Sequence, residues 1–399
     1  MNILFAPAHY YLSDGLGTEV SWPFYAMQAL AEKGHTVYAI CGYADLTGKL
    51  PDNVHLTVIF PKKRGDNALE EYRRKLYFYK RVAQEVRRIR SENPIDIVHH
   101  FAPISPQSSN ISAIRGELKD LPFTIGPAMI PGTKKSELGL SLGVKQDWRL
   151  RLTRLLLDII GVPAFWLHKK TLRQADCIMA ATDDAATYYR QFVDAKRVVV
   201  EPAGISVETY EVVGKKHDPN IVLSVCYLTP RKGIDVLIKA FAKIMPKHPQ
   251  ARLWIVGNGP QEEELVQLAK QEGLGSAVRF WGFVNNTQVG RYYAEAGIFA
   301  SPTRHEPFGQ TLLEAMAAGL PVVASHTGAV PKIISKEVGF THKVDDIAQV
   351  AQLLDKLLSD QKLARQLGER ARERVREHYS WSVIMDHYLT IWQKLLNKS

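Results

Sequence analysis

Two carboxylates stand eight residues apart in the stretch 299–331, which reads FASPTRHEPFGQTLLEAMAAGLPVVASHTGAVP. Glu306 precedes a helix that we expect to begin at Gly309, and Glu314 is the only charge inside that helix. The free amides and the dipole of a helix N-terminus attract an anion. Such a junction could hold the diphosphate of a sugar nucleotide, with the carboxylates accepting hydrogen bonds from its hydroxyls. The alternative is that Glu306 caps the turn and Glu314 is a solvated helix residue.

A lysine lies at a second strand-to-helix turn. The apolar run 221–225 predicts a strand, its exit contains Arg231-Lys232-Gly233, and a helix is expected from Ile234. A cation at such a turn points naturally at phosphate, because the helix N-terminus already favours an anion there. Lys232, with Arg231 beside it, is therefore a candidate to meet the diphosphate.

Histidines follow another predicted strand. The run 95–98 ends in His99-His100-Phe101. A histidine at the carboxyl end of a parallel strand can hydrogen-bond a sugar hydroxyl or take part in proton movement. The alternative is a histidine that is packed or hydrogen-bonded locally.

Glycine turns follow three predicted strands. They are Gly15-Leu16-Gly17 after 2–7, Gly257-Asn258-Gly259-Pro260 after 253–256, and Gly282-Phe283-Val284 after 278–280. Ligands of doubly wound sheets bind at the carboxyl ends of the strands, where these turns are expected. A simple tight turn is the alternative at each of them.

These motifs together resemble the retaining glycosyltransferases of family 4. The resemblance rests on the E-x7-E pattern in EPFGQTLLEAMAAGLPVVAS, on HYYLSDGLGTEVSWPFYAMQALAEKGHTV near the start, and on a strand-end P-x-G-I at 202–205. It implies an α/β protein of the GT-B fold. Such a protein has two Rossmann-like, doubly wound domains with a cleft between them, and a C-terminal helix that crosses back to the first domain.

The resemblance also implies roles for individual residues. Glu306 would contact the donor sugar, Glu314 the ribose and Lys232 the diphosphate, so Glu306, His99 and Lys232 are expected to be catalytic. The expected donor-binding residues are Gly15, Gly17, Arg231, Lys232, Gly257, Phe283, Val284, Glu306, Phe308, Gly309, Gln310, Thr311, Leu312 and Glu314. No Asp-x-Asp pair occurs in the chain, so we expect neither a metal site nor a cofactor.

The chain departs from the family at two positions. Many members carry a second histidine where this chain has Phe101, which leaves His99 as the candidate and His100 as the fallback. Tyr227 stands where the family usually has an arginine, and Arg231 is the candidate replacement. These departures keep open a catalytically impaired GT-B protein that acts as a membrane-associated partner. A same-fold sugar-nucleotide epimerase or phosphorylase is a further alternative, against which the E-x7-E pattern argues.

Length and composition favour two domains. The chain has 399 residues, of which 46% are hydrophobic, enough for two cores of ordinary size. We predict an acceptor-binding domain over 1–213 and a donor-binding domain over 214–377, with a linker at the polar run 214–219. The last helix, within 378–399, is expected to return to the first domain.

The positive charge of the chain is concentrated in one segment. The net charge is +10, and residues 62–90 carry eleven Lys or Arg against four Asp or Glu. The apolar positions of 69–90 recur at helical spacing, which predicts a helix with a basic side. That side is either merely solvated or faces an anionic membrane surface or a phosphorylated acceptor. Nucleic acid is not expected, because no nucleic-acid-binding motif accompanies the charge.

Three scattered cysteines and the lack of a secretory signal favour the cytoplasm or the inner face of its membrane. The predicted function is retaining, metal-independent sugar transfer. The donor would be a UDP-, GDP- or ADP-sugar, and the acceptor a hydroxyl of a glycan, a lipid-linked or a small molecule.

Overall fold

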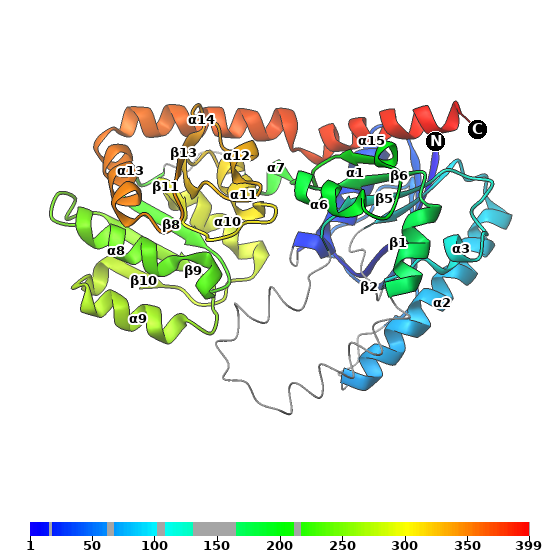
Figure 1. Ribbon diagram of the computed structural model, residues 1–399, viewed down its shortest axis with the longest axis horizontal. Coiled ribbons are helices and arrows are strands. Elements are labelled where there is room, and N and C mark those ends of the chain that lie inside the picture. The colour runs from blue at the N-terminus through cyan, green and yellow to red at the C-terminus, as the bar shows by residue number, and fades with distance from the viewer. Residues whose placement is uncertain (16–17, 62–67, 102–107, 131–164, 211–216, 399) are drawn as a thin grey trace. The chain divides into compact units, whose positions relative to one another are not determined.

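The computed structural model describes residues 1–15, 18–61, 68–101, 108–130, 165–210 and 217–398 (Figure 1). They form two compact units. The first contains the described residues up to 130, 165–204 and 381–398, and the second contains those of 205–380. The chain passes from one unit to the other at 204/205 and at 380/381; the predicted boundary at 213/214 lies outside the described residues, and the predicted one at 377/378 is three residues earlier than the observed one. The reason is local: the Ile205 amide donates to the Tyr379 carbonyl over 2.8 Å, and α7 (Val207–Tyr210) contacts helices of the second unit.

The first unit contains a seven-stranded parallel sheet in the order β3-β2-β1-β4-β5-β6-β7. Its strands are β1 (Asn2–Ser13), β2 (Thr36–Asp45), β3 (Val54–Val58), β4 (Ile97–Phe101), β5 (Phe123–Ala128), β6 (Cys177–Ala180) and β7 (Val198–Val200). Most positions of the central strands are buried, as expected for a parallel sheet covered on both faces. β1 is longer than the predicted 2–7, because it continues beside β2 after a register shift between Phe5 and His9.

Two sets of helices cover this sheet. One face packs against α2 (Ala68–Glu92), α3 (Ile111–Ile114), a helix over 165–174 and α6 (Asp183–Tyr189), through residues such as Phe78 and Leu172. A short turn, η1 (Ala195–Arg197), precedes β7. α1 (Thr18–Glu32) contacts α15 (Trp381–Leu396). The last helix thus belongs to the first unit, as predicted.

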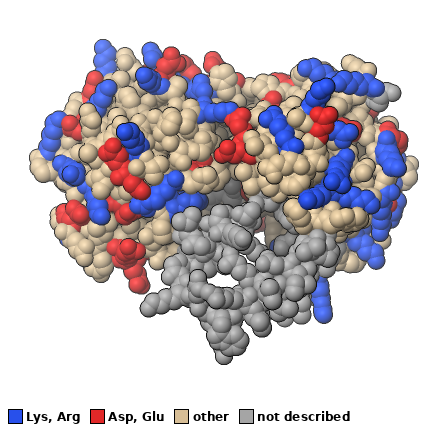
Figure 2. All heavy atoms as spheres, viewed as in Figure 1, with Lys and Arg blue, Asp and Glu red and all other residues tan. Residues whose placement is uncertain are grey.

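The basic helix α2 packs with its apolar side on the core. Val82, Val86 and Ile89 are buried as predicted, and Phe78 joins them. The side chains of Leu69, Tyr72 and Leu76 lie outside the described residues. Figure 2 shows Lys and Arg side chains gathered on the right-hand side of the view, which belongs to the first unit. None of the described helices has the length and apolar composition that a bilayer crossing requires.

The second unit contains a six-stranded parallel sheet in the order β10-β9-β8-β11-β12-β13. Its strands are β8 (Ile221–Val225), β9 (Arg252–Val256), β10 (Val278–Phe280), β11 (Ile298–Ser301), β12 (Val322–Ser325) and β13 (Gly339–His342). One core cluster joins the sheet to α8 (Ile234–Ile244), α9 (Glu262–Gln271), α13 (Ile347–Ser359) and α14 (Gln361–His378). The remaining elements are η2 (Pro230–Lys232), η3 (Gly275–Ala277), α10 (Asn286–Glu295), α11 (Gln310–Ala317) and α12 (Val330–Ile333).

Both sheets are doubly wound, which confirms the predicted fold class. Counted along the chain, the second sheet has the order 3-2-1-4-5-6 of a dinucleotide-binding fold. The order reverses between β8 and β11. In open sheets of this kind ligands bind outside the carboxyl ends of the two strands at the reversal.

Candidate active site in the second unit

The loops after β8 and β11 bring Lys232 and Glu306 together at this reversal point. Lys232 Nζ lies 2.9 Å from Glu306 Oε2, and Glu306 Oε1 accepts a hydrogen bond from the Gly309 amide over 3.1 Å. The two side chains are only 14% and 9% exposed. Burial alone would raise the pKa of Glu306, but Lys232, Arg231 and the Gly309 amide together lower it below its usual value. Glu306 is therefore an ionised carboxylate at the start of α11.

Arg231 approaches the same loop from η2. Its Nη1 donates to the His305 carbonyl over 2.7 Å, and its own carbonyl accepts from the Arg304 amide over 2.7 Å. The predicted cations thus lie side by side on η2, one bound to the side chain of Glu306 and the other to the backbone beside it.

The loop that carries Glu306 is held on two further sides. The Ala329 amide donates to the Glu306 carbonyl over 3.0 Å, and Gly328 lies against the same carbonyl with a φ of 53°. Arg304 pairs with Asp235 of α8 through two bonds of 2.8 and 3.1 Å and with Asp345 over 2.8 Å. The position of Glu306 is therefore fixed before any ligand binds.

Glu314 is buried within the second unit. Its side chain accepts a hydrogen bond from the Tyr293 hydroxyl over 2.7 Å and is also hydrogen-bonded to Tyr210 and Gln310. Burial raises the pKa of Glu314 to about 7, although these hydrogen bonds act in the opposite direction. The alternative of a solvated helix residue is wrong, because Glu314 is only 5% exposed.

Glu314→Gln should flatten the pH dependence of stability. The folded-state pKa of about 7 exceeds the usual pKa of 4.5 for a glutamate, so the folded protein binds more protons than the unfolded chain between these values. Stability is then fully present below pH 4.5 and falls as the pH rises to 7, by roughly 3 kcal/mol in total. Urea unfolding at pH 5 and pH 8 measures this loss in the parent protein. An equal loss in the glutamine variant would contradict the assignment.

The other predicted donor residues lie around α11 or on the neighbouring loops. Phe308 and Leu312 are buried, Gln310 and Thr311 are half-buried, and Gly309 begins the helix with a φ of 90°. Gly257, after β9, donates its amide to the Gly282 carbonyl over 2.8 Å. Val284 is half-buried and Phe283 is 74% exposed on that next loop. Gly15 belongs to the first unit, where its amide donates to Ser13 Oγ over 3.2 Å, and Gly17 lies outside the described residues.

The prediction that His99 faces a ligand at its strand end is wrong, because His99 is a core residue. Its Nε2 donates to the Gly126 carbonyl over 2.9 Å, and its Nδ1 lies 2.8 Å from Thr124 Oγ1, which also accepts from Trp392 Nε1. Burial lowers the pKa of His99 to about 3. A neutral ring satisfies every bond in this network, so His99 matches the alternative of a locally hydrogen-bonded histidine.

The fallback histidine is no more accessible. β4 runs through Phe101, so His100 lies inside the strand on the opposite face, and it is fully buried. Burial, with smaller effects of His99 and His168, lowers the pKa of His100 to about 3. Neither histidine is therefore placed to touch a bound ligand.

Sequence reasoning missed three residues that hold the site. Arg304 and Gly328 lie in the same motif as Glu306, and the close approach at Gly328 could have been suspected from a glycine after a strand. Tyr293 precedes Glu314 by 21 residues, and nothing in the sequence connects them. Within the described ranges, no three His, Cys, Asp or Glu side chains gather as metal ligands do.

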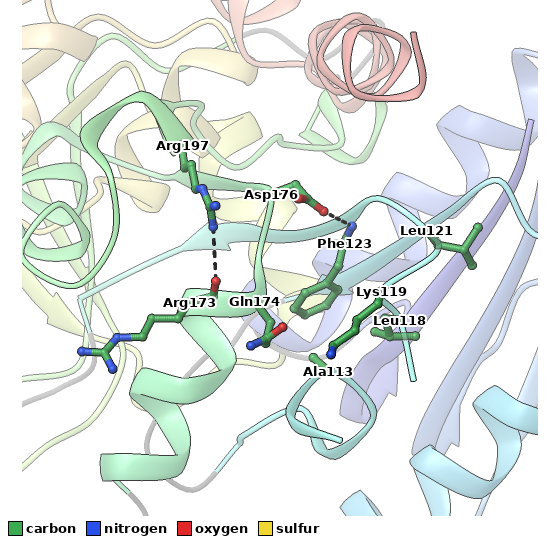
Figure 3. A pocket seen from close by; sticks show the side chains of 9 residues that line it. All are labelled: Ala113, Leu118, Lys119, Leu121, Phe123, Arg173, Gln174, Asp176 and Arg197. Carbon is green, nitrogen blue, oxygen red and sulfur yellow. Dashed lines mark hydrogen bonds between the residues drawn. The ribbon is translucent and has the colours of Figure 1, made fainter. Parts of the chain in front are cut away.

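A pocket in the first unit lies away from the strand ends that carry ligands in such sheets. Lys119, Phe123, Arg173, Asp176 and Arg197 are among the residues that line it (Figure 3). Phe123 begins β5 and Asp176 precedes β6, so the pocket is at the amino ends of these strands. Asp176 accepts from the Phe123 amide over 2.8 Å, and Arg197 donates to the Arg173 carbonyl over 3.2 Å. Both bonds join a side chain to the backbone of another segment, and they therefore stabilise the first unit.

Comparisons with known proteins agree with this architecture. A family model described as Glycosyltransferase Family 4 matches residues 24–209, and one described as Glycosyl transferases group 1 matches residues 208–374. Sucrose-phosphate synthase from Thermosynechococcus elongatus superposes on 100% of this chain and 99% of its own, with a TM-score of 0.69 at 21% identity. At that identity the likeness shows the fold.

Two curated relatives match part of the chain. An uncharacterized glycosyltransferase of Methanocaldococcus jannaschii is 36% identical over 182 residues, 45% of this chain and 46% of that protein. A GDP-mannose-dependent monoacylated alpha-(1-6)-phosphatidylinositol monomannoside mannosyltransferase of Corynebacterium glutamicum is 30% identical over 208 residues, 50% of this chain and 54% of that protein. The chain thus spans about half the length of these relatives. With two family models over residues 24–374 and two doubly wound sheets, the chain belongs to the glycosyltransferases of family 4 and has the GT-B fold.

Proposed function

We propose that the protein is a retaining glycosyltransferase that moves a sugar from a nucleotide diphosphate sugar to a hydroxyl acceptor. The observation that carries this proposal is the buried Lys232–Glu306 pair at the reversal point of the second sheet, where α11 begins. The name of the Corynebacterium relative, a GDP-mannose-dependent transferase, supports a nucleotide sugar as donor. The UDP-, GDP- and ADP-sugars all have the diphosphate that this site would recognise.

The cations of η2 would stabilise the leaving diphosphate. As the bond between the sugar C1 and the phosphate oxygen breaks, negative charge grows on that oxygen. Lys232, Arg231 and the first amides of α11 supply fixed positive charge at the place where the anion departs. The reaction would therefore proceed without a metal ion or a cofactor.

The proposed chemistry takes place on one face of the sugar. The acceptor oxygen bonds to C1 on the side that the phosphate leaves, and the phosphate oxygen takes the acceptor proton. Such a route needs no histidine as a base, which fits the burial of His99 and His100. Glu306 would contact the hydroxyls of the donor sugar, and Glu314 the ribose.

One observation favours the alternative of a catalytically impaired protein. Tyr227, where the family usually has an arginine, is 61% exposed and brings no charge to the site. Incubation with UDP-, GDP- and ADP-sugars, followed by assay of released nucleoside diphosphate and of thermal shift, separates the two readings. Release with any donor supports the enzyme. A thermal shift without release, also in the presence of a panel of glycan and lipid acceptors, supports the impaired protein.

We also propose that α2 attracts an anionic membrane surface from the cytoplasmic side. Several arginines of its second half are already paired within the unit: Arg87 with Glu117 and Arg88 with Glu92, both over 2.7 Å. Arg73 and Lys80 are exposed, and within the described residues no acidic side chain pairs with them. The charge available to lipid is therefore smaller than the sequence count indicates.

Arg73→Gln/Lys80→Gln should weaken sedimentation with anionic vesicles by about 10-fold or more at low salt, since each cation near such a surface is worth about 1 kcal/mol. Arg87→Gln/Arg88→Gln is the matched control, and it should change binding less, because those charges are already neutralised. Binding of the parent should fall as salt rises. If both variants and the parent sedimented equally, the proposal would be wrong, and α2 would be a helix with its apolar side on the core and its basic side in water.

A further inference from the structure

Three consecutive large apolar side chains are exposed at the first described residues of the helix over 165–174. Phe165 and Leu167 are each 37% exposed, and Trp166 is 60% exposed. Single exposed apolar residues are common on protein surfaces, but a contiguous group that includes a tryptophan marks an interaction site. None of these residues belongs to the candidate site of Lys232 and Glu306, which lies in the second unit.

Two lysines stand one helical turn after these rings. Lys169 Nζ lies 4.6 Å from the centre of the Phe165 ring and 5.3 Å from that of Phe192, and Lys170 Nζ lies 5.4 Å from the centre of the Trp166 ring. Arg173 is exposed one turn further along. The outer side of the helix over 165–174 therefore presents apolar rings and, one turn later, cations beside them.

The inner side of the helix fixes this orientation. Leu172 is fully buried in the core, and Thr171 Oγ1 accepts from the Asn110 amide over 3.1 Å. His168 is also fully buried. Because the inner positions are fixed in this way, the helix cannot rotate to bury Trp166 in the core of the unit.

We propose that Phe165, Trp166 and Leu167 form an apolar anchor for an anionic lipid bilayer. Tryptophan is favoured at the membrane interface, where its ring is apolar and its N–H remains in polar surroundings. Phe165 and Leu167 would enter the same layer, while Lys169 and Lys170 extend toward lipid phosphates, as long cationic side chains do. A protein partner could use the rings, but the lysines beside each ring match a surface of dense negative charge.

The anchor deepens the membrane attraction proposed for α2, and it does not depend on sugar transfer. The α2 helix packs on the same face of the first sheet. Its exposed cations act over a distance through charge, whereas the rings act only on contact with the acyl layer. The two contributions can therefore be separated by measuring binding and insertion independently.

The test uses vesicles of phosphatidylcholine with and without phosphatidylglycerol, including lipids brominated on the acyl chain, which quench tryptophan fluorescence within the bilayer. We expect Trp166→Ala to lower the fraction sedimented with anionic vesicles at least 10-fold. Trp166→Phe should keep most binding and lose the quenching. Tyr227→Ala, which removes an equally exposed ring of the second unit, should behave as the parent. Thermal melting checks that each variant is folded.

The outcomes separate the two membrane proposals. Sedimentation without quenching in the parent overturns the anchor and keeps the attraction by α2. Quenching that persists in Trp166→Phe places another tryptophan in the bilayer and also overturns it. Lys169→Gln/Lys170→Gln should reduce the preference for anionic over neutral vesicles while α2 retains its own part of that preference, and an unchanged preference would contradict the role of these lysines. Absence of sedimentation by the parent at low salt overturns both proposals.

Discussion

Lys232→Ala should lower the turnover of sugar transfer by about 10² or more, because removing one fixed charge that stabilises a departing anion costs roughly 3 kcal/mol. The structure adds a second effect. Lys232 is the cation paired with the buried carboxylate of Glu306, so its removal leaves that carboxylate with only Arg231 and the Gly309 amide to stabilise its charge. We therefore expect a lower free energy of unfolding as well, by up to about 3 kcal/mol.

A double variant separates these two effects. Glu306→Gln in the Lys232→Ala background removes the buried carboxylate charge that has lost its lysine, so it should restore stability, but it should not restore turnover. Measuring kcat, KM and urea unfolding for both single variants and the double variant completes the cycle. Recovery of activity in the double variant would mean that Lys232 only stabilises the folded protein and does not stabilise the leaving diphosphate. An unaltered rate in Lys232→Ala would leave Arg231 as the residue that meets the diphosphate.

Gly328→Ala should reduce turnover by a similar factor through the backbone. A Cβ at this position would lie 2.1 Å from the carbonyl oxygen of Glu306, so the loop that carries Glu306 must shift. A displacement of about 1 Å at a reacting group can cost about 10² in rate. We expect kcat to fall more than KM rises, since the diphosphate cations on η2 stay in place.

Gly273→Ala is the matched control for this change. Gly273 also has a left-handed φ, 71° against 53° for Gly328, but a Cβ there would meet nothing within 4 Å. Both variants bear the conformational cost of alanine in this region, about 1 kcal/mol, and only one moves Glu306. Equal activities of the two would show that the position of Glu306 is not limiting.

Much of this architecture could be predicted from local sequence signals. The buried runs, the glycine turns and the helical periodicities placed most strands and helices, because parallel sheets require continuous apolar strands and short turns. Lys232 and Glu306 were each predicted as site residues because both turns lie at carboxyl ends of strands, but the ion pair between them was not predicted. Strand order, which makes β8 and β11 neighbours, was available only from the family resemblance.

The failed prediction at His99 and the rejected alternative at Glu314 share one physical cause, which is burial by segments distant in sequence. His99 seemed free at a strand end, but Trp392 and Tyr388 of α15 cover it from nearly 300 positions away. For Glu314, the alternative of a solvated residue rested on its being the lone charge of its helix, and it fails because Tyr293 and Tyr210 enclose the side chain. A local pattern shows the periodicity of a helix but not the partner that covers each of its sides.

The position of α15 has a consequence for synthesis on the ribosome. Trp392 and Tyr388 are fully buried in the first unit, although they follow the whole second unit in the chain. The sheet that begins at residue 2 therefore lacks its covering helix while residues 205–380 are synthesised. This synthesis takes on the order of 10 to 40 s at about 5–20 residues per second. During that interval the second unit can fold completely, whereas the nascent first unit exposes an apolar surface. Chaperones are expected to engage the protein at this stage, and the last helix to release it from them.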